Sequence, residues 1–121
     1  ELFSLVMHMV DFTIHDEKVI LTRKLLLTEQ FHDERVRKLA TKHFLSGTKV
    51  IYTEIFEKMM EAGLLKRGDA EMLAFLFTSP ITVLIHTCDR EPERETAIMQ
   101  QIKDFVRYFI GTYGNESGEH L

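Results

Sequence analysis

Three polar residues near the N-terminus have the types and the spacing that could bind a metal ion. His8, Asp11 and His15 follow one another at intervals of three and four residues, which places them along one side of a helix. Imidazole nitrogens and carboxylate oxygens are zinc ligands, but a tetrahedral site needs a fourth donor, and none is evident on this side. We therefore interpret the three residues as a solvated surface, or as a contact surface for another domain, and expect no metal.

The other residues that could take part in chemistry do not form a recognisable catalytic arrangement. Glu29 and His32 match the Glu-x-x-His unit of di-iron bundles, yet such sites need a second unit and further glutamates, and the sequence has no second unit. His86 and Cys88 are two residues apart and would point to different sides of a helix, and a thiol at an apolar helix end is inert. A nucleophile elbow, a phosphate loop and a Cys-x-x-Cys pair are also missing. We expect no catalytic residues, no cofactor and no enzyme activity.

Length, composition and charge limit the class of protein further. The chain has 121 residues, which is enough for one domain with a hydrophobic core. Its net charge is −4 and its pI is about 5.9, whereas a domain that binds nucleic acid by itself usually has a basic surface. The single cysteine, Cys88, rules out an internal disulfide and fits a reducing compartment. No signal peptide is visible, so we expect a cytoplasmic protein.

One segment of the chain is unusually apolar. Between Met72 and Cys88 the only ionisable side chains are those of His86 and Cys88. A membrane span needs roughly 18 or more consecutive apolar residues, and this run is shorter and includes Pro80 and several hydroxyl side chains. We therefore predict a buried helix, and no membrane partner.

The elements that must position these residues are predicted to be helices, because no stretch shows the sustained alternation of a strand. We expect helices over Leu2–Ile14, Asp16–Gln30 and Glu34–Ala62, a fourth helix that begins after Asp69 and contains Met72–Cys88, and a fifth that ends near Tyr113. Asp16, Asp33 and Asp69 are the predicted N-caps, and Gly63 is the predicted terminating glycine.

Two of these helices are expected to bend. Ser46-Gly47 lies in the middle of the third helix, and Gly/Ser pairs are common kink sites. Pro80 lies inside the fourth helix, where proline lacks an N–H group and clashes with the preceding turn. Pro92, in contrast, suits the first turn of the last helix.

The apolar fourth helix predicts an oligomer. A helix that is apolar nearly all round must be covered on all sides, and a chain of about five helices has too few neighbours to cover it. Two helices from each of two subunits would form a four-helix interface about a two-fold axis; a further part of a longer protein could cover the same surface instead. We predict an all-α, antiparallel bundle of about five helices, with the last two forming a four-helix dimer interface.

The second half of the chain has an order of elements that is known from one protein family. In YTEIFEKMMEAGLLKRGDAEMLAFLFTSPITVLI, a long helix ends at Glu61 and Gly63, a turn contains Gly68-Asp69, and an apolar helix follows. A charged loop over Asp89–Glu95 and an amphipathic helix through Phe105–Tyr113 complete the order. Over roughly residues 16–113 this pattern resembles the C-terminal half of the TetR/AcrR-family transcriptional regulators.

The resemblance implies a bacterial regulator whose C-terminal domain, here residues 1–114, binds a ligand and forms a homodimer. Residues 115–121 are expected to be a flexible tail. The family's helix-turn-helix domain comes first in its chains and is absent from this sequence, so we expect a longer protein that contacts operator DNA only through that domain. A small hydrophobic effector in the bundle would change operator affinity through a coupling free energy between the two sites.

The family places its pocket between helices, which predicts ligand-binding residues on the first, third and fourth helices. These residues are Met9, Phe12, Phe44, Thr48, Tyr52, Phe75 and Thr78. The sequence contains nine Phe and six Met, and Met adapts to varied ligands. For each of these residues plain core packing is the alternative, because most apolar helix residues are core.

The predicted dimer interface takes one line of residues from each of the last two helices. It comprises Phe77, Ile81, Leu84, Ile102, Phe105 and Phe109. On this prediction Phe105→Asp would weaken the dimer, because it buries an unpaired charge. The competing interpretation of the whole chain is a helical homodimeric structural or protein-interaction domain with no small-molecule ligand.

Overall fold

The computed structural model describes residues 1–115, which form an all-α bundle. Its helices are α1 (Leu2–His15), α2 (Glu17–Glu29), α3 (Glu34–Thr41), α4 (Gly47–Glu61), α5 (Ala70–Arg90) and α6 (Glu95–Tyr113). A π-helical segment, Lys42–Ser46, joins α3 directly to α4, and a 3-10 turn, Pro92–Arg94, precedes α6. Since α3, the π segment and α4 form one uninterrupted run, residues 1–115 form five helical rods, and the prediction of an all-α bundle of about five helices is confirmed.

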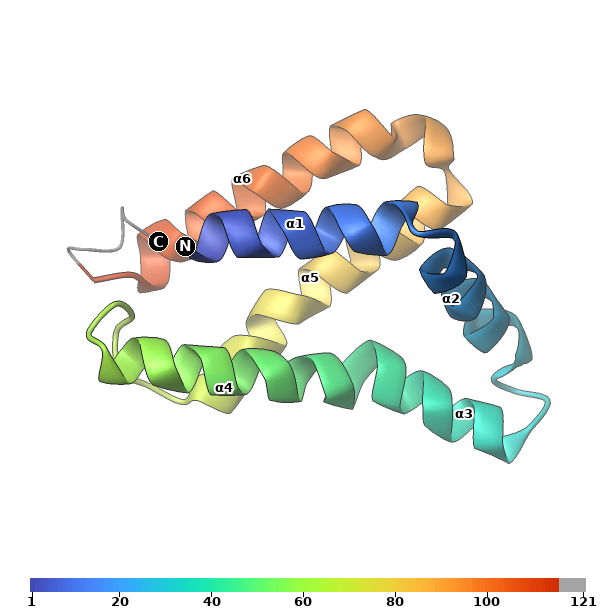
Figure 1. Ribbon diagram of the computed structural model, residues 1–121, viewed down its shortest axis with the longest axis horizontal. Helices are drawn as coiled ribbons and strands as arrows, with labels where there is room; N and C mark the ends of the chain where they lie inside the picture. The colour runs from blue at the N-terminus through green and yellow to red at the C-terminus, as the bar shows by residue number, and fades with distance from the viewer. Residues whose placement is uncertain (116–121) are drawn as a thin grey trace.

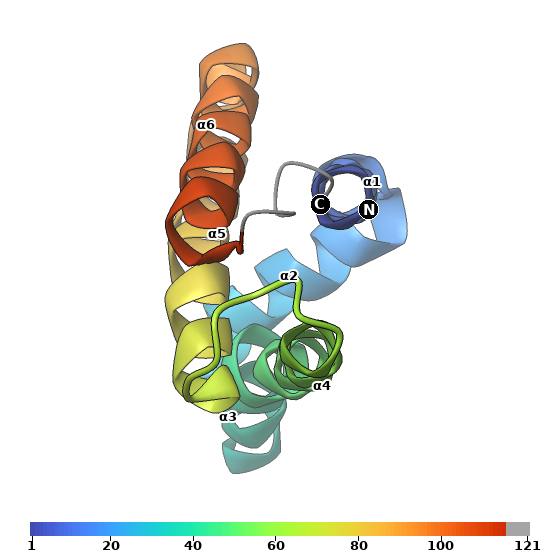
Figure 2. The ribbon, with the colours of Figure 1, turned by 90° about the vertical axis from the view of Figure 1, so that its left-hand side faces the viewer.

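The rods are arranged in two layers. The long helices α5 and α6 form one layer, and on one side of it α1 packs against α6 and α4 packs against α5 (Figure 1). Seen from the end of the molecule, α2 crosses from α1 to the α3–α4 run and closes the space between them (Figure 2). The helix α5 therefore touches both α6 in its own layer and α4 in the other.

The predicted helix ends are present. Each of the three aspartate N-caps accepts a hydrogen bond from a backbone N–H: Asp16 from Val19 at 3.0 Å, Asp33 from Arg35 at 2.7 Å and Asp69 from Met72 at 3.0 Å. Such caps satisfy donors that a helix N-terminus leaves free. Gly63 follows α4 with a φ of 77°, a conformation that glycine adopts without the strain of a side chain.

The predicted bend near Ser46-Gly47 takes the form of the π-helical segment. The backbone N–H of Gly47 donates to the carbonyl of Lys42, five residues earlier. A Cβ atom at Gly47 would lie 2.8 Å from that same carbonyl oxygen, so glycine is the residue that fits this close approach. Pro80 lies inside α5, which continues through it from Ala70 to Arg90; the kink expected there stays a prediction.

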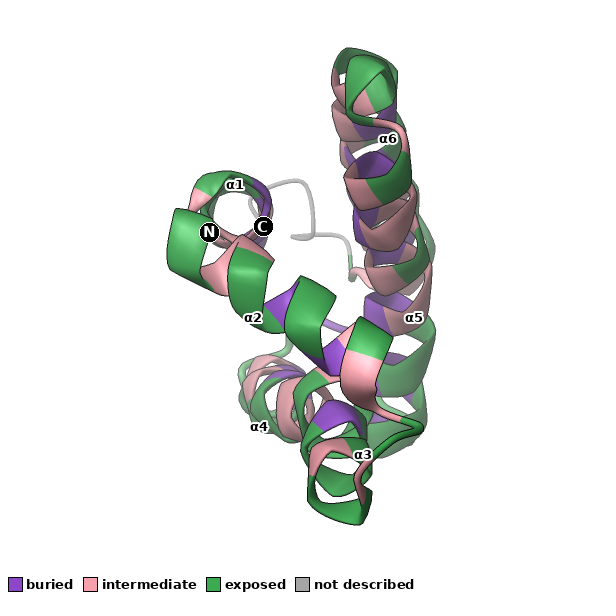
Figure 3. Ribbon diagram, turned by 90° about the vertical axis from the view of Figure 1, so that its right-hand side faces the viewer, coloured by how far each residue is buried: buried purple, intermediate pink, exposed green. Residues whose placement is uncertain are grey.

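An aromatic cluster forms the centre of the core. The rings of Phe56, Phe77 and Phe109, from α4, α5 and α6, lie within 4.6–5.5 Å of one another and are almost fully buried. Apolar residues at one-turn spacing on α6 and α1 continue the core on either side: Ile98, Ile102 and Val106, and Leu2, Val6, Val10 and Ile14. Figure 3 shows these buried positions on the inner sides of the helices.

The residues predicted to form the dimer interface lie mostly in this core. Phe77, Ile81, Ile102 and Phe109 are buried within the single chain, and Leu84 and Phe105 are half-buried. They therefore offer little surface to a second copy. Helical periodicity identified apolar stripes correctly, but α5 has more than one stripe, and the periodicity could not show which stripe the rest of the chain covers. The uncovered apolar side chains of α5 are Met72, Phe75, Leu76 and Val83.

Two further expectations concern the C-terminus and α5. Asn115, where a flexible tail was expected to begin, donates from its side-chain amide to the carbonyls of Gly63, at 2.7 Å, and Leu65, at 3.1 Å; residues 116–121 lie outside the described part. By length and composition alone α5 could cross a membrane. Eight of its 21 residues are buried within the chain, including Phe77 and Ile85, and core helices pass the same test.

Candidate functional site

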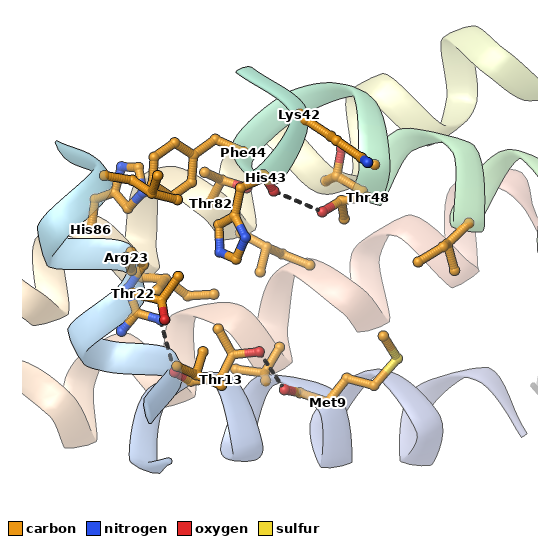
Figure 4. Close-up of a pocket in the computed structure, with 18 of the residues that line it drawn as sticks. Met9, Thr13, Thr22, Arg23, Lys42, His43, Phe44, Thr48, Thr82 and His86 are labelled. Carbon is orange, nitrogen blue, oxygen red and sulfur yellow. Dashed lines mark hydrogen bonds between the residues drawn. The ribbon is translucent and has the colours of Figure 1, made fainter. Parts of the chain in front are cut away.

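A cavity of about 620 Å³ lies between α1, α2, the π segment, α4 and α5. Its volume is within the roughly 300–1,000 Å³ that is typical of small-molecule sites. Figure 4 shows side chains from all these elements pointing into the same space. The helix α6 does not line it, so the cavity and the aromatic cluster occupy different parts of the bundle.

The structure brings five of the seven predicted ligand-binding residues to this cavity. Met9, Phe44, Thr48, Tyr52 and Thr78 line it. The other two, Phe12 and Phe75, are 55% and 43% exposed and lie on outer surfaces of α1 and α5.

The wall that α2 contributes to the cavity was not predicted from the sequence, nor were the charged residues of the lining. The helix α2 contributes Val19, Thr22, Arg23 and Leu26, and the π segment contributes Lys42 and His43. No feature of α2 marked it as a wall, because its apolar residues are scattered around the helix. His86 did have a usable signal, since an ionisable side chain in so apolar a run is unusual.

The wall formed by α1, α4 and α5 is mainly apolar. It includes Met9, Ile51, Tyr52 and Ile81. The Tyr52 hydroxyl donates to the sulfur of Met9 at 3.6 Å, and burial raises the pKa of Tyr52 to about 12. Tyr52 is therefore a neutral phenol that contributes a ring surface and one hydroxyl group to this wall.

A buried ion pair lies at the other end of the cavity. Arg23 on α2 is only 3% exposed. Its guanidinium donates two hydrogen bonds to the carboxylate of Asp89 on α5, the longer at 2.7 Å. A third N–H donates to the carbonyl of Thr13 on α1 at 2.9 Å. Fork-shaped pairs of this kind fix geometry as well as charge. Arg23 thus ties together the three helices that close this end.

Two histidines lie beside the ion pair. His43 extends from the π segment into the space between the helices, and His86 on α5 lies against the ring of Phe44, with ring centroids 5.0 Å apart (Figure 4). Burial lowers the pKa of both histidines, and the charge of Arg23 lowers each pKa further. Both imidazoles are therefore favoured in the neutral form near pH 7, where each has one N–H donor and one acceptor.

Apart from Tyr52, which is a neutral phenol, the ionisable residues of the lining are all bases. They are Arg23, Lys42, His43 and His86; no Asp or Glu is among the described residues that line the cavity. The remaining polar groups are chiefly threonine hydroxyls, and no nucleophile and base are paired. The arrangement suits binding of a molecule with one polar end and one apolar end.

The other candidates from the sequence have local roles. His15 joins Asp11 at 3.0 Å through one ring nitrogen and Glu95 of α6 at 3.1 Å through the other, while His32 pairs with Glu29 at 3.0 Å. Within residues 1–115 no group of three or more His, Cys, Asp or Glu residues could hold a metal ion. Cys88 is buried, and burial raises the pKa of its thiol, which makes it less reactive.

Comparisons of the chain with protein-family models, with curated proteins and with solved structures found no match. The resemblance to TetR/AcrR-family regulators therefore stays a prediction. The features of the molecule that bear on function are the cavity, the ion pair beside it and the exposed apolar side chains of α5.

Proposed function

We propose that the chain is the effector-sensing and dimerisation domain of a bacterial transcriptional regulator similar to the TetR family. The observation that carries the proposal is the cavity of about 620 Å³, whose lining contains five of the residues expected to bind an effector. In this proposal a small hydrophobic molecule occupies the cavity and alters the DNA affinity of a separate N-terminal helix-turn-helix domain. The net charge of −4 agrees with DNA contacts being made elsewhere.

The way the cavity is built supports a sensing role. Its walls come from six helical elements, because Leu39 of α3 also lines it, so a molecule inside it changes how they pack against one another. The ion pair between Arg23 and Asp89 connects one wall to the end of α5, immediately before the turn into α6. Differential binding of the effector to two arrangements of these helices would supply the coupling free energy that such regulation needs.

The uncovered apolar side chains of α5 support dimerisation. Met72, Leu76 and Val83 recur at spacings of four and seven, which places them on one side of the helix, and all three are exposed. Tyr108, on the helix α6 that packs beside α5, is 72% exposed. A second copy that applies the same surface would bury these side chains about a two-fold axis.

Native mass spectrometry of the chain at low micromolar concentration tests both parts of the proposal. The expected result is a dimer, which a co-purified effector would make heavier by a few hundred daltons. Leu76→Glu should raise the dimer dissociation constant at least tenfold, because a charge would be buried without a partner. The control is Leu21→Glu, at an exposed leucine on α2 (67% exposed, against 46% for Leu76), which should leave the constant unchanged. A monomeric wild-type chain would contradict the dimer.

A structural or protein-interaction domain without a ligand is the second candidate. It is favoured by exposed apolar residues far from α5 and α6, namely Leu21, Leu25 and Phe31, because exposed apolar surface marks partner sites. A dimer that binds no small molecule in any assay would support this candidate over the sensing domain.

A further inference from the structure

We infer that the cavity binds an amphipathic anion, with its acidic group beside Arg23, His43 and His86 and its apolar body along Met9 and Tyr52. This inference rests on the proposed function, because it takes the cavity to be an effector site. It goes further by assigning the chemical class of the effector and the orientation in which it binds.

The basic residues of the lining lie at one end of the cavity. Arg23, His43 and His86 come from α2, the π segment and α5 and gather at one end of the cavity, with Lys42 also in the lining. Among residues 1–115, the carboxylate at this end is that of Asp89, which is paired with Arg23. A cationic ligand would meet positive charge in a partly desolvated place, and an anionic one would be attracted by it.

Arg23 has N–H donors that the protein itself does not use. A guanidinium has five N–H donors, and three of them donate to Asp89 and Thr13. Each nitrogen of Arg23 therefore already makes one hydrogen bond, and the second N–H of each terminal nitrogen has no acceptor among the described residues of a side chain that is buried and lines the cavity. Buried donors are normally paired. A carboxylate or phosphate oxygen of a ligand would pair them, and each neutral imidazole could donate one further N–H.

The opposite end specifies the body of the ligand. Met9, Ile51 and Ile81 present aliphatic side chains there, and Tyr52 presents a ring surface. Burial of a hydrocarbon chain against such walls is favourable, because it removes apolar surface from water. A medium-length acyl chain or an aryl acid therefore fits both the lining and the volume of about 620 Å³.

The position of the acidic group also indicates how ligand binding would change the packing of α5 near the turn into α6. His86 is one helical turn before Asp89, and Asp89 lies in the last turn of α5, three residues before the 3-10 turn that leads into α6. An anion on the two remaining N–H groups of Arg23 shares the positive charge of the guanidinium with Asp89, which weakens the attraction between Arg23 and Asp89. The occupied state therefore loosens a contact that holds the end of α5 against α2.

Calorimetric titration of the whole chain with three probes of equal chain length tests the inference. Decanoate, 1-decanol and decylamine carry an anionic, a neutral and a cationic head on the same apolar chain. Because a hydrogen bond to a charged group contributes more than a neutral one, decanoate should bind at least tenfold more tightly than 1-decanol. Decylamine should bind most weakly.

Substitution of the two histidines locates the acidic group. His43→Gln and His86→Gln should each weaken decanoate binding several-fold and leave the affinity for 1-decanol unchanged, which also shows that the variants are folded. His32→Gln is the matched control, because His32 is exposed and pairs only with Glu29. Arg23 is not replaced, since its loss would leave Asp89 buried without a partner.

The outcomes separate this inference from the function on which it rests. Equal binding of decanoate and 1-decanol, or tighter binding of decylamine, would overturn the anion while keeping the cavity as an effector site. A preference for decanoate that survives both histidine substitutions would overturn the assigned orientation. If none of the three probes binds, the sensing function itself is contradicted.

Discussion

The two halves of α5 lie in different environments. Before Pro80, Leu73, Ala74 and Phe77 are buried among the aromatic rings of α4 and α6. After it, Ile85 and His86 line a cavity, and Asp89 pairs with an arginine of α2. One continuous helix therefore takes part in a close-packed apolar core at one end and in a hollow, charged site at the other.

This contrast suggests that one half of α5 mainly stabilises the fold and the other half mainly forms the binding site. Close-packed interiors resist change, because every missing atom costs packing energy. A hollow site keeps unfilled space and buried polar groups, each of which lowers stability. The aromatic half of α5 can offset that cost, so the two halves should respond very differently to substitution.

The largest loss should come from the aromatic half. Phe77→Ala removes a fully buried ring that touches Phe56 and Phe109, so the free energy of unfolding should fall by about 3–5 kcal/mol. Urea unfolding followed by circular dichroism measures this. Phe75→Ala, two residues away and 43% exposed, is the control and should cost about 1 kcal/mol or less. Similar losses for the two variants would contradict the burial of Phe77.

The next largest effect should come from the ion pair at the cavity end. Asp89→Leu leaves the guanidinium of Arg23 buried without its partner, which should lower the free energy of unfolding by about 3 kcal/mol. The double variant Arg23→Met with Asp89→Leu replaces the pair by apolar side chains and should recover most of this loss. Additive losses in the double variant would show that the pair is not coupled.

A smaller effect is expected at the π segment, which carries His43 and Phe44 into the cavity. Gly47→Ala would place a Cβ atom 2.8 Å from the Lys42 carbonyl oxygen, so this backbone must shift, at a cost of about 1–3 kcal/mol. The shift should also weaken decanoate binding. Gly68→Ala, where a Cβ atom meets no atom within 4 Å, should change neither quantity. Unchanged binding in Gly47→Ala would mean that the π segment does not position the site.

The smallest effect should depend on pH. Glu95 and Asp11 accept hydrogen bonds from His15, and Glu95 in particular raises the His15 pKa above its ordinary value. The resulting stabilisation is complete below the unfolded pKa of about 6.5 and is lost as the pH rises through the folded pKa. His15→Gln should therefore lower the free energy of unfolding at pH 5.5, and not at pH 9. Because His15 is half exposed, the difference should be about 0.5 kcal/mol or less.

Chemical denaturation of the wild type and His15→Gln at both pH values measures this difference. His32→Gln serves as the control, because among the described residues the side chain of His32, in the turn after α2, pairs with Glu29 alone. A larger loss at pH 9 than at pH 5.5 would reverse the sign and exclude the bridge between α1 and α6 as its cause.

Local chemistry in the sequence determined the helices of this protein. Asp16, Asp33 and Asp69 cap the helices that they were predicted to cap, and Gly63 ends α4. Capping and termination depend on residues a few positions apart, so they can be inferred from sequence alone. The same holds for the apolar character of α5, which periodicity and composition show directly.

Only the tertiary structure decided which stripe of each helix is covered. Phe77 and Phe109 were expected at a dimer interface and are core residues, while Leu76 and Val83 remain exposed. The pairing of Arg23 with Asp89, 66 residues apart, was equally beyond local reasoning. The physical reason is that an apolar stripe is favourable against any apolar partner, because the hydrophobic effect has no direction. The partner is selected by how all five rods pack together, and so is the place where they leave a cavity.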